Sequence, residues 1–269
     1  MEKTTKKERI IKIIEKNKNS FHYNGKVYNT DKTLDILAIY DELFNEYKEK
    51  NINLLELGVR EGGSLLLWND YFDKCNIVGL DLNKVDCTDY LPNMNVYQGS
   101  QADLNLIDKI RQNHALNGFD IIIDDCSHIG QLTKISFWHL FDNHLKDGGI
   151  YAIEDWGTGY WSSWPDGHKY SNKGKKKQYS LLDKLLQYYL NRSLSKNTIK
   201  KINWLSHYFR KKKIKNHSYG MVGFIKELID ECGATDISHP EFGVGLPRKS
   251  KFDFVAVYPG IVFIKKQKL

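Results

Sequence analysis

The chain alternates short apolar runs with longer amphipathic runs from Asn51 onward, and this alternation limits the folds open to it. Repeated β-α-β units with this pattern build a parallel sheet with helices on both of its faces. Several apolar runs are therefore predicted strands, and the amphipathic stretches between them are predicted helices. The strands are residues 53–57, 77–82, 94–98, 119–123 and 150–154, and the helices are residues 64–72, 103–113 and 132–145.

Two more β-rich runs close the chain, over residues 252–258 and 261–264. The Pro259-Gly260 pair between them indicates a tight turn, so the two runs are predicted to form a hairpin. One of its strands would then run antiparallel to the rest of the sheet. The sequence predicts an α/β fold: a Rossmann-like, seven-stranded, mostly parallel sheet with one antiparallel strand and helices on both faces.

The alternation stops between the fifth and sixth predicted strands. Residues 156–219 are first rich in aromatic residues and glycine, then contain a predicted helix over residues 179–194 and a basic stretch, and a further helix is predicted at residues 221–232. So long an interval without a strand is predicted to be an insertion that covers the site as a lid or a substrate platform.

Composition narrows the class of protein. Hydrophobic residues make up 41% of the 269 residues, which is enough for a packed core and excludes disorder as the main state. The four cysteines have no C-x-x-C spacing, so neither a cysteine zinc site nor a disulfide framework is predicted, and a cytoplasmic location is expected. The apolar run at residues 10–14 is too short and too lysine-broken to span a membrane.

The formal net charge is +7, and lysines gather at residues 173–177, 210–215 and 265–268. Such runs attract nucleic acid, an anionic lipid surface or an anionic glycan, or they form a solvated surface. No base-stacking motif or zinc finger accompanies them, so nucleic acid is not the expected partner.

Carboxylates follow two of the predicted strands. Asp124-Asp125 come directly after the apolar run 121–123, and Glu154-Asp155 come directly after residues 150–153. The carboxyl ends of parallel strands meet at one edge of a sheet, which is where open α/β sheets bind ligands. Together with His128, these acids would hold a hard divalent cation beside a general base.

A glycine-rich turn follows the first predicted strand, with Glu56 before Gly58 and with Gly62 and Ser64 after it. Such glycines let the backbone approach a ligand closely, and the acid can accept hydrogen bonds from a ligand amine or hydroxyl. The spacing is not the G-x-G-x-x-G of dinucleotide binding. Asp81 ends the second strand, where an acid binds ribose hydroxyls. The turn and Asp81 together predict a nucleotide-like cofactor.

Three further polar residues have more than one interpretation. Ser100 and Gln101 follow the third predicted strand, where they would meet an adenine edge or cap a helix or turn. Asp124 would contact the cofactor, accept a hydrogen bond behind the site, or satisfy backbone amides at the strand end. All three are kept as candidate cofactor contacts.

Taken together, these blocks resemble class I S-adenosylmethionine-dependent methyltransferases. The resemblance starts from E-x-G-x-x-x-G-G-S at Glu56 and the acid at Asp81. Further blocks are similar to the metal-dependent sugar O-methyltransferases that act on deoxysugars of macrolide antibiotics. They are Tyr28 to Lys32, Asp125 to His128, Tyr151 to Asp155, Tyr160-Trp161, Gly220 to Phe224 and Tyr258 to Phe263.

The resemblance implies Mg²⁺-dependent transfer of a methyl group from S-adenosylmethionine to a sugar hydroxyl. The acids that hold magnesium in that family correspond to Asp125, Glu154 and Asp155, and oxygen ligands suit this cation. The family's general base corresponds to His128. A histidine that caps or packs against a helix start is the alternative interpretation of His128.

The resemblance also implies roles for the two flanking regions. Residues 1–50 are expected to be an N-terminal helical segment that folds over the pocket, with Thr30 and Lys32 near the cofactor, and residues 51–269 are the methyltransferase domain. A helix capped at Thr30 or Asp31 is equally compatible with that block. Tyr160 and Trp161 would stack on sugar faces, or they would dock the insertion itself.

The expected acceptor is a sugar in a small glycoside, a nucleotide sugar or a surface polysaccharide, and a homo-oligomer is compatible with the resemblance. Two other functions stay open at this point. One is another metal-dependent α/β enzyme with a hydrolytic metal site or a nicotinamide site. The other is an RNA-binding or RNA-modifying methyltransferase that uses the +7 charge.

Overall fold

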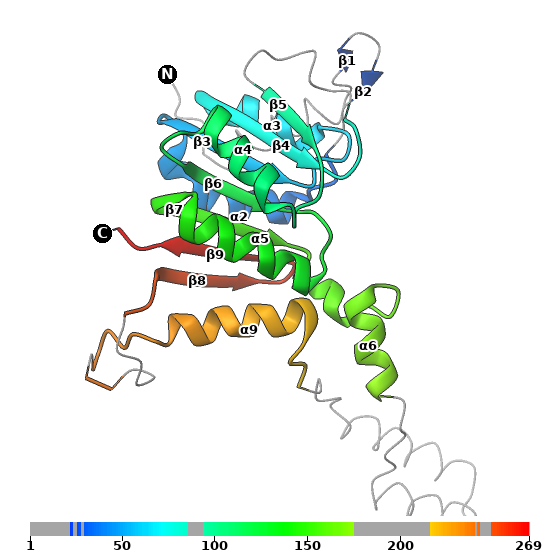
Figure 1. Cartoon of the computed structure of the whole chain (residues 1–269), viewed down its shortest axis with the longest axis vertical. Coiled ribbons are helices and arrows are strands. Elements are labelled where there is room, and N and C mark those ends of the chain that lie inside the picture. Colours follow the sequence, from blue (N-terminus) through cyan, green and yellow to red (C-terminus); the bar gives the residue numbers. More distant parts are fainter. Residues whose placement is uncertain are drawn as a thin grey trace, which may run out of the picture.

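The computed structural model describes residues 22–23, 26–27, 30–85, 94–174, 216–239, 241–242 and 249–268. Figure 1 shows one large sheet with helices packed on it. Its strands are β3 (Asn51–Leu57), β4 (Lys74–Asp81), β5 (Met94–Gln98), β6 (Phe119–Asp124), β7 (Leu145–Glu154), β8 (Phe252–Tyr258) and β9 (Ile261–Lys266). The helices are α2 (Leu34–Phe44), α3 (Gly63–Tyr71), α4 (Leu104–His114), α5 (Gly130–Asn143), α6 (Pro165–Gly174) and α9 (Gly220–Cys232), with short 3-10 helices η1 (Asn45–Tyr47) and η3 (Trp156–Tyr160).

The seven strands lie in the order β5-β4-β3-β6-β7-β9-β8. Strands β3 to β7 pair in parallel, and β9 runs antiparallel to both of its neighbours, β7 and β8. This is the predicted Rossmann-like sheet with a single antiparallel strand, and the prediction is confirmed. The order reverses between β3 and β6, and such a switch point is where open α/β sheets bind their ligands.

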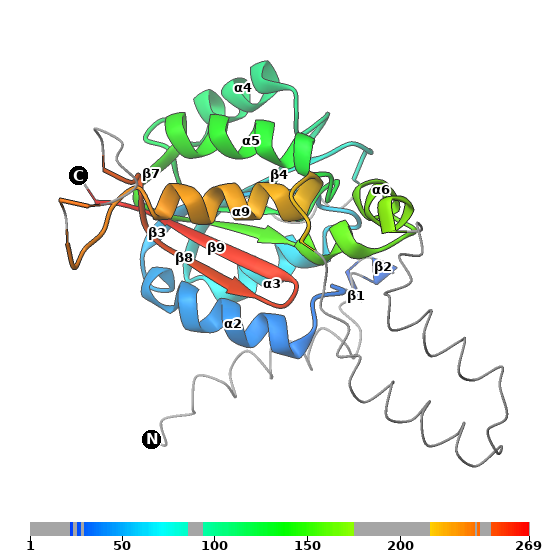
Figure 2. The same ribbon diagram turned by 90° about the horizontal axis from the view of Figure 1, so that it is seen from below.

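Each strand contributes to two cores, because successive side chains point to opposite faces of a sheet. On β3, Leu54 packs in the core formed with α2 and α3, whereas Leu55 packs in the core formed with α4, α5 and α9. Figure 2 shows these two helical layers on opposite sides of the sheet. The predicted helices between the first five strands are confirmed with boundaries within about two residues.

Aromatic packing anchors α2 to the sheet. The ring centroid of Tyr40 lies 5.0 Å from that of Trp68 on α3 and 5.2 Å from that of Phe263 on β9. Edge-to-face ring pairs of this kind add about 0.5–1.5 kcal/mol each beyond the burial of their surface. The helix is therefore held firmly on the sheet, and the residues just before it are brought to the strand tips.

The described part of the N-terminal segment combines a short hairpin with this helix. Strands β1 (His22–Tyr23) and β2 (Lys26–Val27) pair antiparallel. Helix α2 begins at Leu34 and is capped by Thr33, whose side chain accepts a hydrogen bond from the backbone N–H of Ile36. The cap is therefore neither Thr30 nor Asp31, so the capped-helix interpretation of those two residues is wrong.

One buried carboxylate joins the start of the insertion to the body of the protein. Asp166, in the first turn of α6, accepts hydrogen bonds from the backbone N–H groups of Gly130 and Met221, each at 2.9 Å. These groups lie in the first turns of α5 and α9, where N–H groups lack partners within the helix and the helix dipole favours a negative charge. Asp166 therefore holds the ends of three helices together.

Two lysines of the C-terminal basic run have structural contacts. Lys265 pairs with Glu46, and Lys266 donates hydrogen bonds to the backbone carbonyls of Phe141 and Leu145. Some sequence predictions lie outside the described residues and stay predictions. They are the helix over residues 179–194, the lysine run 210–215, most of the run 173–177 and the apolar run 10–14.

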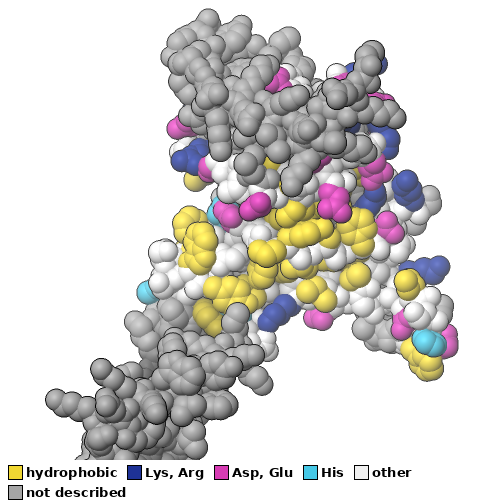
Figure 3. Space-filling view, turned by 180° about the vertical axis from the view of Figure 1, so that it is seen from behind, with side chains coloured by type: hydrophobic (Ala, Val, Ile, Leu, Met, Phe, Trp, Pro, Cys, Tyr) yellow, Lys and Arg dark blue, Asp and Glu magenta, His cyan; other side chains and the backbone are white. Residues whose placement is uncertain are grey.

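Figure 3 shows the face that carries α2, where hydrophobic side chains gather beside a row of acidic ones. Partly buried apolar residues of α2 and β8 pack against the core below them, among them Ile36, Ile39, Phe254 and Tyr258. Within the described part of the chain, no helix has the length and apolar character needed to cross a membrane.

We expect Asp166→Ala to lower the free energy of unfolding by about 2 kcal/mol or more, because two buried backbone N–H groups lose their acceptor. Urea denaturation followed by circular dichroism measures this loss. Asp230→Ala, at an exposed position of α9, is the matched control and is expected to change stability by less than about 0.5 kcal/mol. Equal losses in the two variants would contradict the role of Asp166.

Candidate active site

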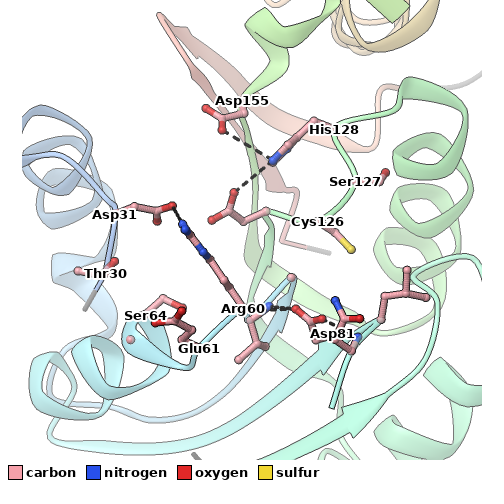
Figure 4. Close-up of a pocket in the computed structure, with 16 residues that line it drawn as sticks. Thr30, Asp31, Arg60, Glu61, Ser64, Asp81, Cys126, Ser127, His128 and Asp155 are labelled. Carbon is pink, nitrogen blue, oxygen red and sulfur yellow. Dashed lines mark hydrogen bonds and ion pairs between the residues drawn. The ribbon is translucent and has the colours of Figure 1, made fainter. Parts of the chain in front are cut away.

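A cavity of about 520 Å³ lies at the carboxyl ends of β3, β4, β6 and β7. We call it the strand-tip cavity, and Figure 4 shows the side chains around it. Its position follows from the register, because Leu57 of β3 pairs with Asp124 of β6 and with Leu80 of β4. It is lined by Thr30, Asp31, Gly58 to Glu61, Gly63, Ser64, Asp81 to Asn83, Asp125 to His128, and Asp155.

Gly58 sets the floor of the strand-tip cavity. Its φ angle is +86°, and a Cβ atom added there would lie 2.1 Å from the backbone oxygen of Asp125. Only glycine combines this backbone conformation with so close an approach. The absence of a side chain brings the glycine-rich turn directly against the acidic block that follows β6.

Asp81 holds the glycine-rich turn in shape. One of its carboxylate oxygens accepts hydrogen bonds from the backbone N–H groups of Val59 at 2.9 Å and Arg60 at 2.8 Å. The other accepts from the N–H of Asn83 at 2.8 Å. Asp81 still lines the strand-tip cavity, so this acid both orders the turn and faces a ligand.

Backbone strain concentrates at this cavity. Among the described residues other than glycine, a positive φ occurs at Arg60, His128 and Asp155, with values of 51° to 52°. All three line the strand-tip cavity. A residue held in this region costs about 1–3 kcal/mol and persists where the surrounding structure enforces it, which is most often at functional sites.

His128 lies between two carboxylates that come from different strands. Its Nε2 atom is 3.8 Å from Asp125 Oδ1, after β6, and 3.7 Å from Asp155 Oδ2, after β7. Figure 4 shows the imidazole directed into this gap. One potential ligand atom from each residue lies within 4.8 Å of the other two, so the group could hold a metal ion.

Glu154 lies deeper, in a buried cluster around Lys32. The Nζ atom of Lys32 is 2.5 Å from Glu154 Oε1, 2.8 Å from Asp125 Oδ2 and 3.6 Å from Glu56 Oε1. The Tyr40 hydroxyl donates a further hydrogen bond to Glu154, at 2.6 Å. Burial alone would lower the pKa of Lys32, but the three carboxylates outweigh it and raise this pKa well above its usual value.

Glu56 is fully buried and does not line the strand-tip cavity. Within the described part of the chain, neither of its carboxylate oxygens accepts a hydrogen bond, and Lys32 is its nearest charge partner. Burial raises the pKa of Glu56 to about 7, although Lys32 opposes the shift. This side chain is therefore poised to accept hydrogen bonds from a ligand that reaches it.

The remaining predicted contacts of the cofactor fall into two groups. Thr30, Gly58, Ser64 and Asp81 line the strand-tip cavity, and Gly62, with φ of +84°, forms the turn that starts α3. The rest lie outside its wall. They are Lys32, Glu56, Ser100, Gln101 and Asp124.

The side chains of Gln101 and Asp124 are joined by hydrogen bonds. The Gln101 side-chain amide donates to both oxygens of Asp124 at 3.3 Å, and its oxygen accepts from the backbone N–H of Ser127 at 3.2 Å. Burial raises the pKa of Asp124 to about 7. Ser100 accepts a hydrogen bond from the N–H of Ala102, as expected of a turn. These contacts support the segment that carries His128.

Aromatic residues of the insertion differ in their exposure. The Tyr160 ring packs edge-on against Tyr170 at 5.5 Å and against His217 at 5.3 Å, so it contacts the insertion itself. Trp161 is 53% exposed. The Trp164 ring lies 5.9 Å from the His128 ring, and its indole N–H donates to the backbone oxygen of Ser127.

Sequence reasoning missed two features of the site. The hydroxyl of Tyr40 reaches Glu154 from α2, and no local motif marks a tyrosine 114 positions away as its partner. Arg60 forms an exposed ion pair with Asp31 across the mouth of the cavity, at 2.6 Å. An arginine within a glycine-rich turn was the available signal for this second contact.

Comparison with solved structures defines the class of fold. The chain is similar to MycE methyltransferase from the mycinamycin biosynthetic pathway in complex with Mg and SAH, with a TM-score of 0.62 and 24% identity over 95% of this chain. The match covers 54% of MycE, so this chain spans about half the length of that enzyme. The chain therefore has the Rossmann-like methyltransferase fold.

Sequence comparison narrows the resemblance further. Over 129 residues the chain is 38% identical to mycinamicin VI 2''-O-methyltransferase of Micromonospora griseorubida, which covers 45% of this chain and 31% of that enzyme. It is 34% identical to demethylmacrocin O-methyltransferase of Streptomyces fradiae, over 45% of this chain and 32% of the relative. The similar stretch is thus about a third of the length of each relative. No family model matches the chain.

We expect Glu56→Gln to change how stability depends on pH. Glu56 binds its proton more tightly in the folded chain, with a pKa of about 7 against 4.5, so it lowers stability as pH rises through this window. Glutamine has no such titration. Relative to wild type, the variant should gain up to about 3 kcal/mol between the low and high ends of the window.

Urea denaturation of the metal-free chain at several pH values measures this gain. Glu61→Gln, an exposed change in the same turn, serves as the control and should leave the pH profile of wild type intact. A constant stability difference between Glu56→Gln and wild type across the window would contradict the burial of an ionisable Glu56.

Proposed function

We propose that the chain is a Mg²⁺-dependent methyltransferase that moves a methyl group from S-adenosylmethionine to a sugar hydroxyl. The observation that carries the proposal is the position of His128 between Asp125 and Asp155, on the wall of the same cavity that the glycine-rich turn lines. The similarity to mycinamicin VI 2''-O-methyltransferase and demethylmacrocin O-methyltransferase supports transfer of a methyl group to oxygen. The acceptor is a sugar of a glycoside, a nucleotide sugar or a surface polysaccharide.

The cofactor side of the site fits S-adenosylmethionine. Gly58 lines the cavity without a side chain, and the buried oxygens of Glu56 lack hydrogen-bond donors among the described residues. Asp81 ends β4 and is suited to the ribose hydroxyls. S-adenosylmethionine supplies an electrophilic methyl group and leaves as S-adenosylhomocysteine. Thr30 and Ser64 would bind the same ligand from the cavity wall.

The metal side of the site fits Mg²⁺, because carboxylate oxygens dominate its donor set. Asp125 and Asp155 would hold the ion, together with Glu154. Lys32 engages one oxygen of Asp125 and leaves the other directed toward His128. When bound, the ion supplies Lewis acidity that lowers the pKa of an acceptor hydroxyl and fixes its orientation.

His128 acts as the general base of the proposed reaction. Its Nε2 atom takes the proton of the acceptor hydroxyl while the hydroxyl oxygen forms a bond to the methyl carbon. The carbon–sulfur bond breaks, and its electron pair stays on sulfur. Asp125 and Asp155 flank Nε2 within 4 Å, so the imidazole is directed toward the position that the ion and the acceptor hydroxyl would occupy.

Aromatic residues beside His128 favour a sugar as the acceptor. Trp164 packs against the imidazole, and the exposed ring of Trp161 lies nearby in the chain. Flat apolar rings suit the C–H face of a pyranose, whereas its hydroxyl groups remain free to reach the carboxylates. Tyr160 would support these rings from within the insertion.

We expect His128→Ala to reduce methyl transfer by about 100-fold or more, because general-base catalysis contributes at least that much. Binding of S-adenosylhomocysteine, measured by calorimetry, should be preserved. The matched control is His239→Ala, at an exposed position in the loop after α9. Full transfer activity in His128→Ala toward every acceptor of a sugar panel would contradict the assignment of the base.

Metal dependence has a separate test. A chelator should abolish transfer, added Mg²⁺ should restore it, and Asp155→Asn should raise the Mg²⁺ concentration required. Transfer that persists in a chelator would refute the metal role.

Calorimetry with NAD distinguishes the alternative α/β enzyme, which would bind this ligand. Negligible RNA binding at physiological salt is expected, because the proposed acceptor is a sugar.

A further inference from the structure

A second group of metal-ligating side chains lies between α4 and α5, away from the strand-tip cavity. Asp108 projects from α4, His139 from the last turns of α5, and His144 from the position that ends α5. Both imidazole Nε2 atoms lie 2.6 Å from the same oxygen of Asp108, and they lie 3.3 Å from each other. The three potential ligand atoms therefore already converge on one point.

This group is separate from the proposed active site. Helix α5 begins at Gly130 beside the acidic block and ends at Asn143, and its 14 residues span about 20 Å. His139 and His144 lie at its far end, on the side of the sheet opposite to the strand tips. They have no part in the proposed methyl transfer, so the two groups can be altered independently.

We propose that Asp108, His139 and His144 form a site for a divalent transition metal, with Zn²⁺ as the expected ion. Two imidazoles and one carboxylate are a common ligand set for zinc, and they leave a further position for solvent. That position would face a hollow of about 320 Å³, which is also lined by Arg111, Gln112 and Asn143. The donor set disfavours Mg²⁺, which prefers oxygen ligands and dehydrates reluctantly.

The side-chain geometry of the group suits metal binding. A metal ion is ligated by neutral imidazoles and an ionised carboxylate, and both Nε2 atoms already lie 2.6 Å from one carboxylate oxygen of Asp108. A bound ion would replace these hydrogen bonds and lie between the three ligand atoms.

Arg111 limits the affinity that we expect. It lines the same hollow, and its positive charge opposes that of a metal ion. Asp108 and the two imidazoles must outweigh this repulsion. The site would then act as a staple between α4 and α5, whose contact with each other is otherwise small compared with the contact of α5 with α9.

Zinc titration of the full chain tests the proposal. Zn²⁺ could also bind the group of Asp125, His128 and Asp155, so the titration is made in the His128→Gln background and with excess Mg²⁺ present. This background should still bind one Zn²⁺ by calorimetry, and the ion should raise the melting temperature. Adding Asp108→Asn or His144→Gln should weaken binding by at least about tenfold and remove the thermal shift.

Adding His239→Ala to the same background removes an exposed imidazole outside the group and should leave both readouts unchanged. Circular dichroism establishes that each variant folds. If a variant does not fold, 15N NMR of labelled histidines in the His128→Gln chain takes the place of that variant. Two imidazole Nε2 signals should then shift when Zn²⁺ is added. Absence of zinc binding in His128→Gln, equal affinity in the double variants, or unshifted signals would overturn the proposal.

Discussion

The candidate active site is held together by the ion pairs of the Lys32 ammonium group with neighbouring carboxylates. Three carboxylates at the ends of three strands, Glu56, Asp125 and Glu154, converge on this group in a region nearly closed to solvent. Uncompensated charges buried so close together would cost several kcal/mol, and one internal cation offsets much of that cost. Lys32 also ties the residues before α2 to the strand tips, and so closes one side of the cavity.

The sheet then divides the chemistry between its strand tips. In the proposed reaction, the turn after β3 and the end of β4 would face the cofactor, and the ends of β6 and β7 would face the metal and the acceptor. Their proximity follows from parallel pairing in register and from the lack of a side chain at Gly58. The backbone is strained at Arg60, His128 and Asp155, which lie where these strand tips meet. The packed helices on both faces of the sheet hold these residues in the strained conformation.

The two candidate metal-binding groups in the described part of the chain differ in their ligand atoms and in their exposure. The acidic group is oxygen-rich, opens into the cavity and suits a catalytic Mg²⁺. The second group contains two imidazoles, is half-buried between helices and suits a zinc ion that joins these helices. One fold can carry both, because the ends of α5 lie at opposite edges of the sheet.

Local pattern was sufficient for much of the fold. Apolar runs predicted every strand of the large sheet, and the Pro259-Gly260 turn predicted the hairpin that makes β9 antiparallel. The acids at the strand tips were predictable because strand polarity places carboxyl ends together. The N-cap of α2 was misplaced, since threonines at positions 30 and 33 offer the same local signal and packing of the helix against Trp68 and Phe263 selects between them.

Local sequence patterns were enough to predict the type of sheet, the edge at which a ligand would bind and the residue types available for the chemistry. The partners of Lys32, the hydrogen bonds from Gln101 to Asp124, and the convergence of Asp108, His139 and His144 became visible in the folded chain alone. The physical reason is distance along the chain. Periodicity and turn chemistry act over a few residues, whereas these contacts join side chains 23 to 122 positions apart or depend on how two helices pack.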